Sequence, residues 1–126
     1  MENIASQIIN WIKTYAENAR VKGLVIGVSG GIDSAVVSTL CARTGLPTLC
    51  LEMPIHQAES HVSRAEEHIE FLKAHYPNVN NLRVDLTPVF DQFVTQIPPT
   101  DKSTYEMALA NTRARLRMTT LYYFAG

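Results

Sequence analysis

The chain has 126 residues, of which 46% are hydrophobic and 18% charged, and its formal net charge is −1 at pH 7. This length and composition suit one globular domain with one core, and the near-neutral charge does not indicate a nucleic-acid or anionic-membrane partner. No apolar run approaches the roughly 20 residues of a membrane span, and the acidic, amphipathic N-terminus differs from a signal peptide or an organellar presequence. We therefore expect a cytoplasmic protein.

The first half of the chain alternates helical and strand patterns. Ile4, Ile8 and Ile12 recur at helical spacing and predict an amphipathic helix. A short apolar run that breaks into Ser-Gly-Gly predicts a buried strand, a loop and then a helix that starts near Asp33. A second apolar run, followed by Pro54, predicts another strand. The predicted elements are a helix over 3–19, a strand over 24–28, a helix ending at 43 and a strand over 46–53.

The second half continues the alternation. An apolar repeat at intervals of three and four predicts a helix over 58–76, and a third strand follows over 82–86. Thr87 is the expected N-cap of a short helix that reaches 96, with Pro88 at its first position. The final helix is expected over 107–125 and is expected to pack through one stripe, formed by Met107, Ala110, Ala114, Met118, Leu121 and Ala125.

This order of elements predicts an α/β fold, a three-layer, doubly wound parallel sheet with right-handed crossovers. Ligands of such sheets bind at the carboxyl ends of the strands, which here are 29–31, 54–57 and 85–87. Three strands make a thin sheet, so the fold is expected to be incomplete at its C-terminus. We expect the N-terminal part of a larger α/β domain, or a domain that relies on a partner.

The loop from Ser29 to Ser34 has the features of a phosphate site. Two glycines let the backbone approach an anion, the serines offer hydroxyl groups, and the following helix presents its positive end. Asp33 would repel phosphate, so we expect it to hold a bridging Mg²⁺. The loop lacks the lysine of a Walker A motif and the glycine pattern of a dinucleotide fold. The alternative is a tight turn in which Asp33 is only an N-cap.

Ser-Gly-Gly-x-Asp-Ser after a short strand resembles the pyrophosphate loop of the N-type ATP pyrophosphatases, which include NAD, GMP and asparagine synthetases and several tRNA-modifying enzymes. The resemblance implies an adenine nucleotide alpha-hydrolase-like fold, with Mg²⁺ on Asp33. The ATP-binding residues that it implies are Gly27, Val28, Ser29, Gly30, Gly31, Ile32, Asp33 and Ser34.

The stretch from Asn111 to Met118 narrows the resemblance, because it is similar to the Asn-x-x-Ala-Arg-x-Arg-Met segment of NAD synthetases. Helical geometry places Arg115 beside Asn111 on one flank of the stripe, with the other two arginines on the opposite flank. The resemblance implies that Arg115 contacts deamido-NAD across a dimer interface and that Tyr15 lies near the substrate. The alternatives are a solvated basic helix edge for the arginines, expected above all for Arg113 and Arg117, and a core tyrosine for Tyr15.

The resemblance extends over nearly the whole chain and implies that residues 1–126 are the N-terminal part of an ammonia-dependent NAD synthetase domain. Such a ligase uses ATP and ammonia to convert deamido-NAD to NAD, releasing AMP and pyrophosphate, as a homodimer. No nucleophile or general base is expected among the residues, and this chain alone is expected to have little or no activity. The alternatives are another adenylating pyrophosphatase, such as a tRNA-modifying enzyme, and a truncated, non-catalytic nucleotide-binding module.

Cysteine and histidine spacing does not indicate a metal site. Cytoplasmic thiols stay reduced, so Cys41 and Cys50 are expected to be small buried residues without a disulfide. His61, His68 and His75 recur every seven residues, which favours a polar helix face over a site whose histidines lie four apart. After the second strand, Glu52 stands where some family members have a basic residue, and Gln57 is expected in a solvent loop.

Overall fold

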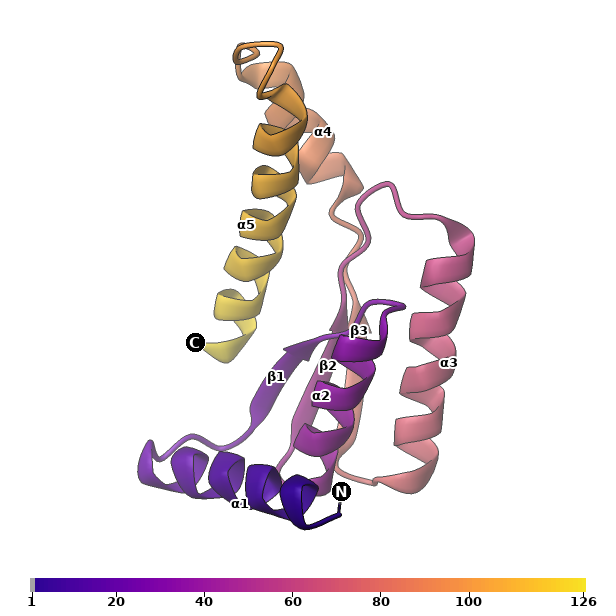
Figure 1. Cartoon of the computed structure of the whole chain (residues 1–126), viewed down its shortest axis with the longest axis vertical. Coiled ribbons are helices and arrows are strands. Elements are labelled where there is room, and N and C mark those ends of the chain that lie inside the picture. Colours follow the sequence, from indigo (N-terminus) through magenta and orange to yellow (C-terminus); the bar gives the residue numbers. More distant parts are fainter. Residues whose placement is uncertain (1) are drawn as a thin grey trace.

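The structure, a computed structural model, describes residues 2–126 and contains five helices and three strands (Figure 1). The order of elements matches the sequence-based prediction, and most boundaries agree within two residues. The elements are α1 (Glu2–Asn18), β1 (Leu24–Gly27), α2 (Ile32–Arg43), β2 (Thr48–Glu52), α3 (Glu59–His75), β3 (Val79–Arg83), α4 (Thr87–Gln96) and α5 (Tyr105–Ala125).

The three strands form a parallel sheet in the order β1-β2-β3. Leu24 lies opposite Thr48, which in turn lies opposite Val79, so the three strands start level with one another. The central strand β2 is almost completely buried, as expected for a strand covered on both faces. The predicted α/β fold class, with helices flanking a parallel sheet, is confirmed.

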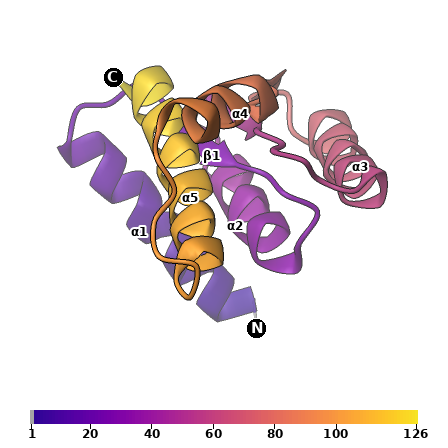
Figure 2. The ribbon, with the colours of Figure 1, turned by 90° about the horizontal axis from the view of Figure 1, so that it is seen from above.

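Two hydrophobic clusters fill the two faces of the sheet. On one face, α2 and α3 contribute Ala42, Ala65, Ile69 and Leu72 to a cluster around Cys50. On the other face, α4 and α5 pack over a cluster that contains Leu51, Met53, Ile55, Leu86 and Phe90. Figure 1 shows α3 beside β3, α5 beside β1 and α1 across the lower end of the sheet, and Figure 2 shows the helices from above. The upper end, where the strands finish, carries the loops that lead from each strand into the next helix (Figure 1).

The third strand was predicted three residues too late, over 82–86. It is an edge strand in which only Val79 is buried, so hydrophobicity does not mark its position. The segment after β3 continues alongside β2 and the residues that follow it. Val84 N–H donates to Glu52 O at 2.8 Å, and Leu86 N–H donates to Pro54 O at 3.0 Å. Backbone hydrogen bonds to β2 thus define β3 as Val79–Arg83. The apolar side chains that suggested a strand over 82–86 mostly belong to the segment that follows it.

The start of α4 also differs by one residue from the prediction. Thr87 is the first helical residue and not the N-cap. The Asp85 carboxylate accepts the Thr87 N–H at 3.0 Å, and so performs the capping that was assigned to Thr87. Hydrogen bonds from the backbone and the side chain of Thr87 are the main causes that lower the pKa of Asp85.

The packing face of α5 was predicted wrongly. Met107 and Met118 of the predicted stripe are 67% and 47% exposed. The side chains that pack toward the sheet are Leu109, Leu116, Leu121 and Phe124, of which only Leu121 belongs to the predicted stripe. Larger side chains on a neighbouring face bury more apolar area than the alanines of the stripe, which explains the rotation.

The cysteine prediction is confirmed, because Cys41 and Cys50 are both buried and free. Burial raises the pKa of the Cys50 thiol to about 11. The histidine prediction holds only in part: His61 and His75 are exposed, whereas His68 is half-buried and its Nε2 lies 2.9 Å from Ser38 Oγ. Within residues 2–126 no helix is long and apolar enough to span a membrane.

Leu72→Ala should lower the free energy of unfolding by about 2–5 kcal/mol, because Leu72 is 0% exposed and its loss leaves a cavity between α3 and the sheet. Phe71→Ala is the matched control, since Phe71 is adjacent and 50% exposed. Urea denaturation followed by circular dichroism measures both values. Equal losses for the two variants would contradict the assignment of this core.

Candidate functional site

The loop after β1 is held in shape by its own two serines. Ser29 N–H donates to Ser34 Oγ at 3.1 Å, and Gly31 N–H donates to Ser29 Oγ at 3.2 Å. The Ser34 hydroxyl also lies within hydrogen-bond distance of Ser29 O, at 3.2 Å, and of Gly31 O, at 3.1 Å. These contacts preorganise the loop at the carboxyl end of β1, which is where parallel sheets bind ligands.

The amino end of α2 points into this loop without a side-chain cap. Gly31 occupies the N-cap position with φ −90° and ψ 161°, and this helix end has no side-chain capping hydrogen bond. The leading N–H groups of the helix are therefore free to bind an anion, and the helix dipole favours one. Asp33 lies exposed in the first turn and does not cap the helix, so the alternative interpretation of Asp33 as an N-cap is wrong.

Gly30 packs directly on the backbone of α3. A Cβ atom at this position would lie 2.6 Å from His61 O and 3.0 Å from His61 Cα, distances too short for any side chain. The requirement for glycine at Gly30 is therefore steric, as well as a matter of access for a ligand. Gly31 has more room, because the nearest atom to its Cβ position is Ser29 Oγ at 3.5 Å.

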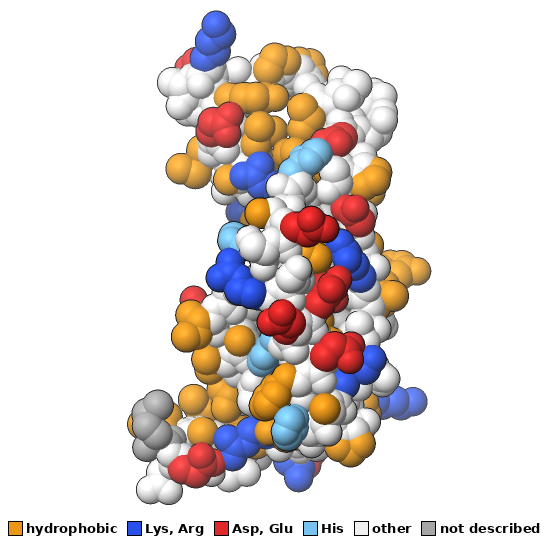
Figure 3. Space-filling model, turned by 90° about the vertical axis from the view of Figure 1, so that its right-hand side faces the viewer, with side chains coloured by type: hydrophobic (Ala, Val, Ile, Leu, Met, Phe, Trp, Pro, Cys, Tyr) orange, Lys and Arg blue, Asp and Glu red, His pale blue; other side chains and the backbone are white. Residues whose placement is uncertain are grey.

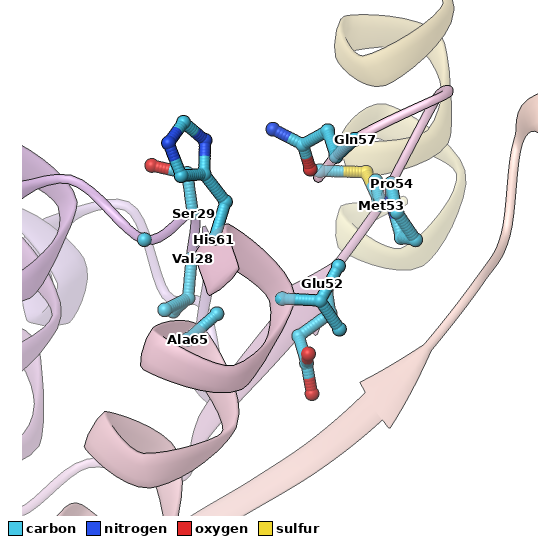
Figure 4. Close-up of a pocket in the computed structure, with 10 residues that line it drawn as sticks. Val28, Ser29, Glu52, Met53, Pro54, Gln57, His61 and Ala65 are labelled. Carbon is cyan, nitrogen blue, oxygen red and sulfur yellow. The ribbon is translucent and has the colours of Figure 1, made fainter. Parts of the chain in front are cut away.

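A narrow cleft separates the loop from the start of α3 and the end of β2 (Figure 4). Val28, Ser29 and Gly30 line one side, and Gln57, His61 and Glu52 are among the residues that line the rest. Glu52 is buried, and burial followed by repulsion from Glu66 raises the pKa of its carboxyl group, whereas Arg83 acts in the opposite direction.

A second cleft, of about 340 Å³, lies between the same loop and α5. Gly27, Val28 and Ser29 line it together with Gln57, and Arg117 is the cationic residue in its wall. Arg117 Nε donates to Met53 O at 2.9 Å, which fixes the side chain against the end of β2. Burial, and secondarily the charge of Arg113, lowers the pKa of Arg117.

The loop after β2 is attached to α4 through His56. His56 N–H donates to Thr87 Oγ1 at 3.0 Å, and His56 Nε2 lies 2.6 Å from Asp91 Oδ1. His56 adopts a φ of 50°, a conformation that non-glycine residues rarely take without support from their surroundings. The next residue, Gln57, lines both clefts, so this attachment holds Gln57 beside the phosphate loop.

The structure places the predicted site residues in two groups. Residues 27–30 line the clefts, and Ile32, Asp33 and Ser34 form the first turn of α2 that begins beside them. Arg115 and Tyr15, the predicted substrate contacts, are both exposed and line neither cleft. Tyr15 instead stacks on Trp11 with 5.4 Å between ring centroids.

Sequence reasoning missed Arg117. Gln57 is exposed in a loop, as expected, and it also lines both clefts. Arg117 was assigned to a solvated helix edge because the packing face of α5 was taken to be that of Met107 and Met118. A signal was available: Leu109, Leu116 and Arg117 recur with helical spacing, and large side chains mark a buried face better than alanines do. The parallel-sheet prediction did place residues 54–57 at the same edge as residues 29–31, but it did not identify Gln57 as a residue that lines both clefts.

Comparison with known proteins gives a consistent result. The NAD synthase family model matches residues 4–126. The NH(3)-dependent NAD(+) synthetase of Finegoldia magna is 38% identical over 97% of this chain and 48% of its own length. The structure of NMN synthetase from Francisella tularensis has a TM-score of 0.85 at 33% identity and covers 98% of this chain and 49% of that chain. The NH3-dependent NAD synthetase from Campylobacter jejuni, in complex with the nitrate ion, has a TM-score of 0.83 at 29% identity, covering 98% and 51%.

This chain thus spans about half the length of the relatives that it matches. The match nevertheless includes every strand and the loop, the α2 terminus and the α5 segment described above. The chain belongs to the NAD synthase family.

Proposed function

We propose that the loop after β1 binds the pyrophosphate part of ATP, with Mg²⁺ held by Asp33, and that the whole protein is an ammonia-dependent NAD synthetase. Residues 1–126 would then be the N-terminal part of its ATP pyrophosphatase domain, in the cytoplasm. The observation that carries the proposal is the uncapped end of α2 beside a preformed, glycine-containing loop. The family membership supports the same assignment.

In the proposed reaction the nicotinate carboxylate of deamido-NAD attacks the α-phosphorus of ATP, and pyrophosphate leaves. Ammonia then attacks the acyl-adenylate carbonyl, which expels AMP and, after loss of a proton, gives the amide of NAD. The described residues would act by neutralising and positioning the phosphates, because no nucleophile is required of the protein. Mg²⁺ would neutralise charge on the β- and γ-phosphates, and the exposed Asp33 carboxylate has the oxygen chemistry that this ion prefers.

A second candidate concerns the acceptor. One solved structure of comparable similarity is that of an NMN synthetase. We therefore propose nicotinate mononucleotide as a second candidate acceptor beside deamido-NAD. Competition between these two compounds for the whole protein would separate the candidates. The tRNA-modifying alternative is less favoured, because Figure 3 shows acidic and basic side chains interspersed over the face beside α3 and the net charge is −1.

Gly30→Ala should weaken ATP binding by about 10-fold or more, because its Cβ would force the loop away from His61 at a cost of about 1–3 kcal/mol. Gly31→Ala should have a smaller effect, since its Cβ has room. Isothermal titration of ATP with Mg²⁺ into each folded variant measures the difference. If Gly30→Ala bound ATP as tightly as the unmodified chain, the loop would not be the nucleotide site.

Asp33→Asn should reduce the dependence of ATP binding on Mg²⁺. With Mg²⁺ present, affinity should fall by about 10-fold, the scale of one lost charged ligand, whereas without Mg²⁺ it should stay equal or improve because a repulsive charge is removed. Titrations in Mg²⁺ and in EDTA give the two values. An equal loss of affinity in both buffers would argue against a metal ligand at Asp33.

We also propose that the protein is a homodimer and that Arg115 and Tyr15 bind deamido-NAD in the assembled enzyme. The support is the exposed apolar face of α5, where Met107, Met118 and Tyr122 are 67%, 47% and 69% exposed. Arg115 lies exposed on the same helix. An arginine at the edge of an interface between copies would suit recognition of a phosphate or carboxylate.

Met118→Glu should shift the protein from dimer to monomer, because a charge would have to be buried in the interface. Light scattering at micromolar concentration, with Lys73→Glu on α3 as the control, measures the change.

The 126-residue chain should also form little or no NAD from ATP, ammonia and deamido-NAD. A normal rate of NAD formation by this chain would contradict that expectation. In the light-scattering experiment, an unmodified chain that is already a monomer would contradict the proposed dimer.

A further inference from the structure

Arg117 is a half-buried cation that forms no ion pair within residues 2–126. It is half-buried on the sheet-facing side of α5, and its Nε–H bonds to the Met53 carbonyl. The ion pairs found within residues 2–126 lie elsewhere, at Arg43, His56 and Arg83. In that part of the chain the structure shows no hydrogen-bond acceptor for its Nη groups. One hydrogen bond therefore orients the guanidinium and leaves most of its donors unused.

Within residues 2–126 no buried side-chain nitrogen lacks a hydrogen-bond partner, so the free Nη groups of Arg117 face solvent, where a ligand can reach them. Removing a charge from water is unfavourable unless an opposite charge or several hydrogen bonds replace the lost hydration. Burial and the neighbouring Arg113 both lower the pKa of Arg117, so the interior does not stabilise this cation. Arg113 itself is accommodated differently, with its guanidinium 5.6 Å above the Phe90 ring. Of these two arginines, Arg117 is the one that lines the cleft beside the loop after β1.

The cleft beside Arg117 reaches the phosphate loop. Its wall includes Ser29 of the loop as well as Gln57, and its volume of about 340 Å³ exceeds what a phosphate group needs. Arg117 approaches from the α5 side of the sheet, whereas the free N–H groups of α2 approach from the opposite side. A chain of phosphates laid across the carboxyl end of β1 would meet the helix end with one part and the guanidinium with another.

We propose that Arg117 binds the α-phosphate of the nucleotide, the group that carries the adenylate, while the loop and α2 bind the pyrophosphate that leaves. This inference rests on the proposed function and adds a substrate-contacting residue to it. A guanidinium matches two phosphate oxygens with parallel N–H donors, which a point charge does not do. Its place on the α5 side, away from the α2 terminus, suits the phosphate that stays with the adenosine.

The test compares adenosine, AMP and pyrophosphate as ligands of the full chain, each titrated calorimetrically. Arg117→Met should weaken AMP binding by about 10-fold or more, the scale of a lost charge-assisted contact, and leave adenosine and pyrophosphate binding unchanged. Arg117→Lys should recover part of the AMP affinity, because it keeps the charge but not the two-oxygen geometry. Arg113→Met is the matched control, as it removes the same charge one turn earlier, and it should leave AMP binding intact.

The outcomes separate this inference from the proposed function. If the unmodified chain binds pyrophosphate but Arg117→Met does not change AMP affinity, or if adenosine affinity falls equally, the role of Arg117 is overturned and the loop assignment stands. If the unmodified chain binds neither pyrophosphate nor AMP, both are overturned. If Arg117→Met does not fold, the role of Arg117 is tested with Arg117→Lys and with the Nε–H NMR signal of Arg117 in the unmodified chain. An AMP-dependent shift of that signal that pyrophosphate does not produce supports the inference, and its absence contradicts it.

Discussion

The close approach of Gly30 to the backbone of His61 is the constraint on which the site depends. Because Gly30 has no side chain, the loop after β1 lies against the first turn of α3, and the two crossover connections of the sheet meet at one point. Ser29 and Ser34 then hold the loop in the only space that this contact leaves. The same contact brings Gln57 and the end of β2 within reach of the loop, so the site is built by packing between helices as much as by the loop itself.

Positive charge reaches this end of the sheet from two sides, as the proposed binding of phosphate requires. The uncapped α2 terminus supplies partial positive charge from one face, and Arg117 supplies a full charge from the other. Asp33 is the local exception, and a carboxylate beside a phosphate site makes physical sense only when a cation lies between them. Glu52 is buried at the same end of the sheet, and burial raises the pKa of its carboxyl group. The proposed anion site would therefore draw on the whole edge of the sheet and not on the loop alone.

Local sequence signals predicted the elements well where the pattern of apolar residues and the turn residues both indicate the element that the structure contains. The strand before Gly27, the helix after Ser34 and the proline-started α4 follow from apolar runs, periodicity and turn residues. Prediction was wrong for β3 and for the face of α5, where tertiary pairing competes with local pattern. β3 is polar and is defined by its hydrogen bonds to β2, and α5 turns its leucines inward at the expense of the methionine stripe.

The sequence by itself determined the chemistry of the phosphate loop, since glycines, serines and Asp33 are contiguous and a six-residue motif needs no distant contact to be recognised. It also determined the fold class, because alternating strands and helices leave few topologies. Only the tertiary structure decided that Gly30 is sterically required and that Gln57 and Arg117 share a cleft with Ser29. These facts depend on segments far apart in the chain, and the side of a helix that faces the sheet is set by the total area buried, which no single stretch of sequence contains.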